Sequence, residues 1–299
     1  MGAPTQRMEA RCRKSPRTVE LFYVGRFSQY LGHPKPSTYP TGRMNESSSK
    51  SGGPADQDSP DKLFETIDRE VSEAVKWFWA TQDMQKAKQQ KSANSTRGRR
   101  ANVLGGKQMD GFASLIEDIL LRFGVPQDSI VHNYQATLPG YFRSEKEWDT
   151  AVVHDGQLLA AVEFKSIASS FGNNLNNRTE ETLGSNTDLR QAYEQGIFAP
   201  SAPPWLGYLM LMARDKKSTR PVSVREPTFT VDLVFDGASY ALRGEVLCLR
   251  MVRQQLVNGA VFMLSDPGGP EGNFTEPNDE LRFERFARRL TYHVLGALK

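Results

Sequence analysis

Two carboxylates and a lysine in the middle of the chain have the side-chain types needed to hold a metal ion and activate water. They are Asp149, Glu163 and Lys165, and they lie in residues 147–166, where two apolar runs flank a His-Asp-Gly turn at 154–156. An Asp-Gly pair between such runs predicts a β-hairpin. Because side chains alternate along a strand, Glu163 and Lys165 point the same way, and Asp149 joins them if the hairpin register brings it across.

This grouping has two interpretations. Burying such charges is costly unless they are paired or bind a metal. Carboxylate oxygens suit Mg²⁺, and a lysine beside them can orient or deprotonate the attacking water. The alternative is a buried salt bridge between Lys165 and either Asp149 or Glu163 in an ordinary hairpin. The spacing alone does not decide, because D-x(n)-E-x-K is a loose pattern.

A resemblance to a known motif favours the metal site. Asp149 followed by Glu163-Phe164-Lys165 resembles the PD-(D/E)xK nuclease motif. Trp148 stands where that motif has a proline. The proline binds no metal in the motif, so this departure leaves the predicted chemistry intact.

Two further segments resemble one family within that class. Residues 165–184 (KSIASSFGNNLNNRTEETLG) are similar to the XhoI-type type II restriction endonucleases, as is the sequence WFWAT at 77–81. The similarity extends from about Leu63 to the C-terminus and excludes the first sixty residues.

The resemblance implies a fold and an activity. The fold is α/β, a PD-(D/E)xK restriction-endonuclease-like core with a central mixed β-sheet flanked by helices. Mg²⁺ would be held by Asp149, Glu163 and the carbonyl of Phe164, while Lys165 orients water. The substrate would be double-stranded DNA with the palindrome 5′-CTCGAG-3′, cut after the first C to leave 5′-phosphate ends. A palindrome is most simply read by a homodimer, and a cognate DNA methyltransferase is expected in the same host.

Two other functions stay open at this point. One is a non-catalytic, sequence-specific DNA-binding protein in which the carboxylates and Lys165 form structural pairs. The other is a PD-(D/E)xK nuclease that acts on damaged or branched DNA. Discrete fragments from defined plasmid DNA would exclude the second alternative.

Hydrophobic periodicity and turn signals predict the elements that position these residues. Helices are expected at 61–78, 108–123, 188–198, 240–256 and 281–298, and strands at 129–137, 148–153, 157–164, 206–212 and 261–264. Up to residue 212 this gives the order helix, three strands, helix and strand, which resembles the PD-(D/E)xK core with its mixed sheet. The strand at 261–264 is expected at the sheet edge. Residues 266–278 are expected to form a loop.

Glu117 lies at the edge of the apolar face of the helix predicted at 108–123. A glutamate at such an edge is commonly only solvated. In the nuclease class that the motif resembles, a glutamate on the helix before the catalytic sheet often faces the metal site. Glu117 is therefore a candidate third catalytic carboxylate, whereas His132 is interpreted as structural or surface-exposed.

Four asparagines and an arginine follow the second hairpin strand within residues 171–178, and we predict that they form a loop. Asparagine favours turns, which is the alternative explanation of this composition. Asparagine also pairs with adenine and arginine with guanine in the major groove. The candidate DNA-binding residues here are Asn173, Asn174, Asn176, Asn177 and Arg178.

Residues 86–107 hold seven Lys/Arg and no acid. Such a run is often only a solvated surface, but in a DNA enzyme it suits contacts to phosphates. Arg97, Arg99 and Arg100 are the candidates, and they would position the protein without reading the sequence.

The net charge of +3 is uneven along the 299 residues. Residues 1–60 hold nine Lys/Arg and five Asp/Glu, or +4, so residues 61–299 hold 29 and 30, or −1. The first segment is rich in Ser, Pro and Gly and is predicted to be a disordered basic tail; nonspecific binding of nucleic acid is the alternative. Residues 61–299 are predicted to form the catalytic and DNA-binding domain, whose DNA contacts must come from local patches.

Other classes of protein are not indicated. There is no run of eighteen apolar residues for a membrane span and no P-loop for ATP. The two cysteines, Cys12 and Cys248, suit neither a zinc cage nor a disulfide. A reducing bacterial cytoplasm is therefore the expected location.

Overall fold

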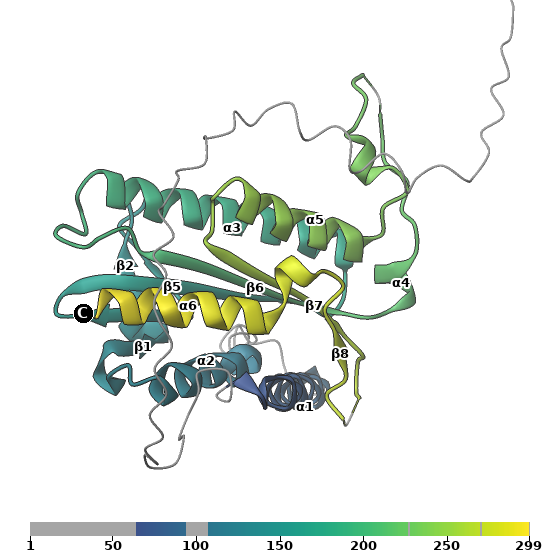
Figure 1. The fold of residues 1–299 in the computed structure, drawn as a ribbon. Helices are drawn as coiled ribbons and strands as arrows, with labels where there is room; N and C mark the ends of the chain where they lie inside the picture. Colours follow the sequence, from purple (N-terminus) through teal and green to yellow (C-terminus); the bar gives the residue numbers. More distant parts are fainter. Residues whose placement is uncertain (1–63, 94–106, 227, 270, 299) are drawn as a thin grey trace, which may run out of the picture. The chain divides into compact units, whose positions relative to one another are not determined.

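The structure is a computed structural model, and it describes residues 64–93, 107–226, 228–269 and 271–298 (Figure 1). The chain divides into two units, Met1–Ala55 and Asp56–Lys299, and every described residue belongs to the second. The predicted tail at 1–60 and the arginines at 97–100 lie outside the described residues. Among the described helices, none is long and apolar enough to cross a membrane.

Six strands of the described residues form one mixed sheet. From edge to edge they are β1 (Ile130–His132), β4 (Thr150–His154), β5 (Gln157–Ile167), β6 (Trp205–Ala213), β7 (Gly259–Ser265) and β8 (Phe274–Thr275). The pairs β5–β6 and β6–β7 are parallel, and the other neighbouring pairs are antiparallel. A separate two-stranded sheet joins β2 (Thr137–Pro139) to β3 (Glu145–Glu147). The predicted central mixed sheet is confirmed.

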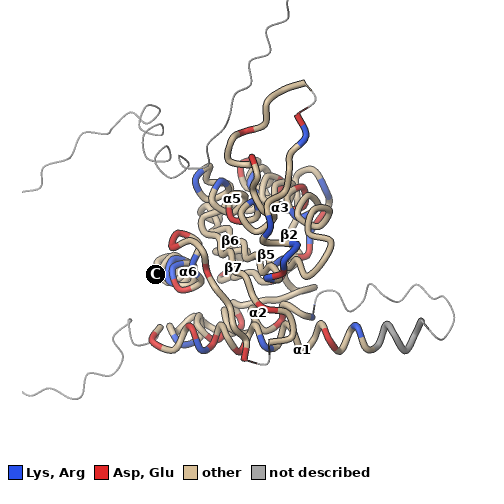
Figure 2. Tube along the Cα trace, turned by 90° about the vertical axis from the view of Figure 1, so that its right-hand side faces the viewer, with Lys and Arg blue, Asp and Glu red and all other residues tan. Residues whose placement is uncertain are grey.

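Helices lie on both faces of the sheet (Figures 1 and 2). One face carries α3 (Phe171–Glu194) and α5 (Tyr240–Arg253), and the other carries α6 (Phe283–Ala297), α2 (Asp110–Arg122) and α1 (Ile67–Ala93). The short helical segments are η4 (Lys107–Met109), η5 (Gln127–Ser129), η6 (Asn133–Ala136), α4 (Lys216–Thr219), η7 (Leu233–Phe235) and η8 (Asp279–Leu281). This is an α/β fold of the restriction-endonuclease-like type.

Strand β6 lies at the centre of the core, and all nine of its residues are buried. Its side chains alternate between the two helical layers. The rings of Trp205 and Phe286 of α6 are 4.9 Å apart between centroids, whereas Met212 lies against Gly244 of α5. A strand covered on both faces needs a continuous apolar sequence, which is why residues 206–212 were predictable.

The hairpin of β4 and β5 forms as predicted. Asp155 and Gly156 both have positive φ, 48° and 73°, which is the conformation of a two-residue type I′ turn. The ladder pairs Thr150 with Val162, so one further step places Asp149 beside Glu163. The register that the sequence left open is therefore the one that the motif requires.

Three local predictions are wrong. Residues 171–178 are not a loop but the first two turns of α3, which starts well before the predicted 188. Residues 129–137 are not one strand, because Asn133 has a positive φ of 51° and separates β1 from β2. Residues 261–264 are not at the edge, because β8 forms within the predicted loop at 266–278 and pairs with β7.

The early start of α3 has a packing cause. Phe171 and Leu175, and then Thr182, Ser185 and Leu189, are buried at helical spacing. Burial of such a stripe stabilises a helix more than individual propensities do, so it outweighs the weak helix propensity of the asparagines between these residues. The prediction of a loop at 171–178 used only the local preference of asparagine for turns and did not take these buried residues into account.

Candidate active site

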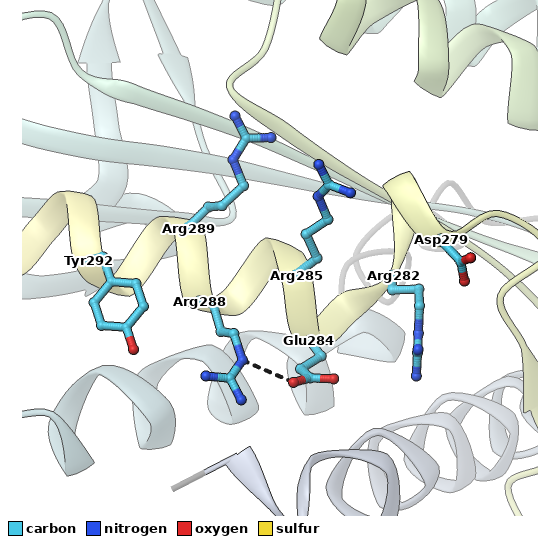
Figure 3. Close-up of a pocket in the computed structure, with 7 residues that line it drawn as sticks. All are labelled: Asp279, Arg282, Glu284, Arg285, Arg288, Arg289 and Tyr292. Atoms are coloured by element: carbon cyan, nitrogen blue, oxygen red, sulfur yellow. Dashed lines mark hydrogen bonds and ion pairs between the residues drawn. The ribbon is translucent and has the colours of Figure 1, made fainter. Parts of the chain in front are cut away.

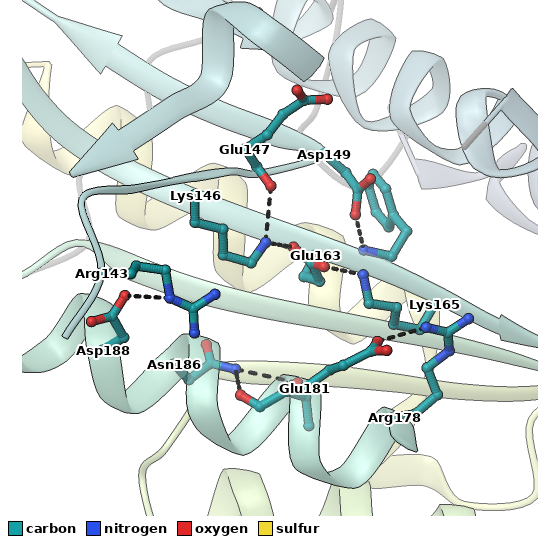
Figure 4. Close-up of polar contacts among 12 residues, drawn as sticks. Arg143, Lys146, Glu147, Asp149, Glu163, Lys165, Arg178, Glu181, Asn186 and Asp188 are labelled. Atoms are coloured by element: carbon teal, nitrogen blue, oxygen red, sulfur yellow. Dashed lines mark hydrogen bonds and ion pairs between the residues drawn. The ribbon is translucent and has the colours of Figure 1, made fainter. Parts of the chain in front are cut away.

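Glu163 is the centre of a charged cluster on the α3 side of the sheet (Figure 4). Its side chain is 6% exposed, and its two carboxylate oxygens have different cationic partners. Lys165 Nζ contacts Oε1, and Lys146 Nζ lies 2.5 Å from Oε2. The prediction that Glu163 and Lys165 share one side of β5 is confirmed.

Asp149 lies directly before β4 and reaches the same strand edge. Its Oδ2 accepts a hydrogen bond of 2.6 Å from the backbone N–H of Phe164. The pKa of Asp149 is raised from 3.8 to about 6, first by burial and then by the negative charge of Glu163, while Lys165, the Phe164 N–H and Lys146 act to lower it. Two carboxylates therefore share a poorly solvated space, where a further positive charge would stabilise their ionised forms.

The backbone of Phe164 belongs to this arrangement. Strand β4 begins at Thr150, opposite Val162, so the edge of β5 beyond Val162 is left to the Asp149 side chain. The N–H and C=O of a strand residue project to the same edge. The Phe164 carbonyl thus faces the side on which Asp149 lies.

These groups fit a divalent metal ion of the hard type. The two carboxylates and the Phe164 carbonyl are the oxygen ligands that Mg²⁺ prefers, and Mg²⁺ usually takes few protein ligands and completes its shell with water and phosphate oxygens. In the described part of the chain, no three His, Cys, Asp or Glu side chains are gathered to hold a metal.

Sequence reasoning missed Lys146. It lies on β3, outside the hairpin that carries the motif, and its side chain is 14% exposed. Besides Glu163, it donates to the Glu147 carbonyl at 2.9 Å and lies 4.4 Å from the centre of the Trp148 ring. The sequence Glu-Lys-Glu is typical of a solvated strand. Only the alternation of side chains along a strand indicates that the lysine points to the opposite face from the two glutamates.

Glu117 has a different partner. Its Oε2 lies 3.0 Å from His132 Nε2, and His132 Nδ1 lies 3.0 Å from the Thr150 hydroxyl. The chain of contacts links α2 to the residue after Asp149, but it does not bring Glu117 into a cluster of three acids with Asp149 and Glu163 among the described residues. The role of Glu117 as a third catalytic carboxylate stays a prediction.

The asparagine-rich segment presents its side chains along the start of α3. Asn173, Asn176 and Asn177 are exposed, while Asn174 donates to the Ser169 carbonyl at 2.7 Å. Arg178 pairs with Glu181 at 2.6 Å. Arg178 and Glu181 lie beside Lys165 in Figure 4. The segment therefore adjoins the cluster, although it is helical; its role in DNA binding stays a prediction.

A second charged region lies on α6, against the other face of the sheet (Figure 3). It is a hollow of about 640 Å³ lined by Asp279, Arg282, Glu284, Arg285, Arg288, Arg289 and Tyr292. Arg288 pairs with Glu284 at 2.9 Å, and Arg282 with Glu276 at 3.5 Å. The sequence analysis did not single out this hollow.

The mixed sheet, with two carboxylates and a lysine at one strand edge, defines a restriction-endonuclease-like nuclease. Sequence comparison identifies the family: the restriction endonuclease XhoI family matches residues 88–276. The type II restriction enzyme BstVI of Geobacillus stearothermophilus is 44% identical over 204 residues, which are 66% of this chain and 91% of BstVI. The type II restriction enzyme XhoI of Xanthomonas vasicola is 41% identical over 188 residues, 62% of this chain and 75% of that enzyme.

A third relative, the type II restriction enzyme AbrI of Azospirillum brasilense, is 42% identical over 165 residues, 54% of this chain and 73% of AbrI. No solved structure is significantly similar to the chain. The chain belongs to the XhoI restriction endonuclease family. It is a type II restriction enzyme, a site-specific deoxyribonuclease that binds double-stranded DNA, and enzymes of this type generally need a divalent metal ion.

Proposed function

We propose that the enzyme cuts both strands of DNA at the palindrome 5′-CTCGAG-3′, after the first C, with Mg²⁺ as its metal ion. The observation that carries the chemistry is the convergence of Asp149, Glu163 and Lys165 at the free edge of β5. The recognition sequence rests on the resemblance of the motif segments and on 41% identity to XhoI.

Each residue has a proposed role. Asp149 and Glu163 would hold Mg²⁺ with the Phe164 carbonyl, and the bound ion would stabilise negative charge at the scissile phosphate. Lys165 would orient the attacking water and hold or release a proton at Nζ. In-line attack on phosphorus would break the bond to the 3′ oxygen and leave the phosphate on the 5′ end. The ion pair of Lys165 with Glu163 supports this role because it holds Nζ beside the ligands.

The remaining partners follow from the substrate. A palindrome presents the same site on both strands, so we propose a homodimer with one active site for each strand. The host chromosome must be protected from cutting at this sequence. We therefore propose a cognate DNA methyltransferase in the same bacterial cytoplasm. We also retain Asn173, Asn174, Asn176, Asn177 and Arg178 as DNA contacts.

Digestion of a plasmid with a single CTCGAG site, with Mg²⁺ or with EDTA, tests the proposal. We expect one Mg²⁺-dependent double-strand cut, with a four-base 5′ overhang on sequencing of the ends. Discrete cuts at another sequence would retain the nuclease chemistry and reject the proposed site. Cutting that persists in EDTA would reject the metal site.

A further inference from the structure

The hairpin of β2 and β3 ends in two exposed aromatic residues, Tyr141 and Phe142. Tyr141 is 49% exposed and Phe142 is 70% exposed. Their rings lie edge to face, with centroids 4.9 Å apart, so they form one apolar projection. An exposed aromatic pair is unfavourable in water and commonly marks a binding surface.

A buried carboxylate holds this tip in place. Asp188 of α3 is 3% exposed, and its Oδ1 accepts the backbone N–H groups of Tyr141 at 2.9 Å and Phe142 at 2.6 Å. Its Oδ2 lies 3.0 Å from Arg143 Nε. A side chain at Gly140 would collide with the same carboxylate. The tip is thus a preorganised projection, and a ligand would bind it with little ordering cost.

The same hairpin reaches the candidate active site. Lys146 of β3 lies 2.5 Å from Glu163, and Arg143 and Asp188 lie close to the same cluster in Figure 4. DNA whose scissile phosphate lay at Glu163 would therefore meet the hairpin that carries the tip. The guanidinium of Arg143, 44% exposed, adds a positive charge beside the two rings.

The size of the tip favours DNA over a second protein chain. A stable protein interface buries about 800 Å² on each partner. Two aromatic side chains supply about 300–500 Å² even when they are fully buried. The faces of nucleic acid bases, by contrast, bind single aromatic rings, and apolar wedges enter base steps of duplex DNA.

We propose that Tyr141 and Phe142 form a DNA-binding tip that inserts at a base step next to the cleaved phosphate and stacks on the exposed base faces. This inference rests on the proposed function, because it requires DNA at Glu163. It adds a contact that reads the deformability of the site and is separate from the asparagines of α3.

Equilibrium binding in EDTA to a CTCGAG duplex with 2-aminopurine in place of the one adenine of each strand tests the tip, because this adenine pairs with the thymine that follows the proposed cut. Binding of the wild-type protein should raise the fluorescence at this position, because 2-aminopurine brightens when it separates from a neighbouring base. Phe142→Ala should weaken binding about tenfold or more and remove the fluorescence rise, with Tyr141→Ala acting in the same direction. Phe142→Trp should restore both the affinity and the fluorescence rise of the wild-type protein.

Tyr292→Ala is the matched control, because Tyr292 is 48% exposed and lies on α6, across the sheet. It should leave binding unchanged. Unchanged binding by Phe142→Ala would overturn the inference, as would the absence of any fluorescence rise with the wild-type protein. If the wild-type protein sediments as a dimer and Phe142→Ala as a monomer, the tip contacts a second copy of the chain. That result would also overturn the inference.

Measurements on the wild-type protein distinguish a failure of this inference from a failure of the proposed function. If it neither binds nor cuts the CTCGAG duplex, the proposed recognition sequence fails. The variants are then measured on the sequence that the wild-type protein does cut, where an equal affinity of Phe142→Ala and wild type would overturn the DNA-binding tip. The melting temperature of each variant, measured by circular dichroism, must stay at the wild-type value.

Discussion

The two faces of the central sheet carry cations in very different surroundings. On the α3 side, Lys165 and Lys146 contact one Glu163 carboxylate whose side chain is 6% exposed. On the α6 side, Arg285 and Arg289 are exposed to solvent in a hollow that also contains acids. The second region has more arginines, but the charges of the first are less exposed to solvent.

This contrast favours the buried cluster around Glu163 as the reactive site, although the α6 region has more arginines. Exposed ion pairs are screened by water and contribute about 0–1 kcal/mol. Burial penalises the charged form of a carboxylate and strengthens its interactions with neighbouring charges, and both raise the pKa of Asp149 to about 6. The hollow on α6, where Arg285 and Arg289 are exposed, is therefore a weaker candidate for the chemistry.

The largest effect is expected for Lys165→Ala. Loss of the ammonium group should lower the cleavage rate at least about 100-fold, because the attacking water loses its orienting or proton-transfer partner. Specific DNA binding, measured by fluorescence anisotropy, should persist. Lys165→Arg is the matched variant: it keeps a positive charge for Glu163, but guanidinium does not release a proton, so cleavage should stay low.

A fully active Lys165→Ala enzyme would exclude the proposed role. If the alanine variant fails to fold while the arginine variant folds and cuts normally, Lys165 is a structural partner of Glu163. Circular dichroism melting curves distinguish these outcomes.

Asp149→Asn is expected to abolish cleavage and yet stabilise the metal-free fold. The pKa of about 6, above its ordinary 3.8, means that the folded state binds the proton more tightly than the unfolded state. Stability from this group is therefore greatest below pH 3.8 and falls as pH rises to about 6. The full difference corresponds to about 3 kcal/mol at most, and the asparagine should recover part of it at pH 7.

Melting curves in EDTA between pH 4 and pH 8 measure this effect, with the wild-type protein losing stability as pH rises relative to Asp149→Asn. At low Mg²⁺, cleavage by the wild type should fall as pH falls through about 6, because protonated Asp149 binds metal poorly. More Mg²⁺ should move that midpoint to lower pH. A midpoint independent of Mg²⁺ would argue against Asp149 as a ligand.

Lys146→Met should have an intermediate effect. It removes one of two cations from the buried Glu163 carboxylate and should lower the free energy of unfolding in EDTA by about 1–3 kcal/mol. Added Mg²⁺ should reduce the loss if the ion supplies the missing positive charge. Lys86→Met is the matched control, because Lys86 and its partner Asp83 are 58% and 60% exposed. An equal loss in both variants would contradict the importance of burial.

The smallest effect is expected for Arg285→Ala combined with Arg289→Ala. Both arginines are exposed on the α6 face, so the free energy of unfolding should change by less than about 0.5 kcal/mol. Cleavage of plasmid DNA should change less than about twofold, since the cluster around Glu163 lies on the other face. A large loss of cleavage with an unchanged free energy of unfolding would show that the α6 hollow also binds DNA.

The sequence alone determined those features that depend on neighbouring residues. The Asp-Gly turn at 155–156 closed the hairpin, and strand alternation put Glu163 and Lys165 on one side. The apolar run of β6 marked a strand covered on both faces. In each case the geometry is set within a few residues by backbone preference or by side-chain periodicity. These features can therefore be predicted from the local sequence without the rest of the fold.

The tertiary structure decided which distant residues meet. It brought Lys146 of a separate hairpin to Glu163, made residues 171–178 helical by burying Phe171 and Leu175, and used Asp188 to fix the aromatic tip at 141–142. These contacts join segments between 17 and 47 residues apart. Their formation depends on the packing of whole elements, and packing free energy is shared among many side chains that no local pattern contains.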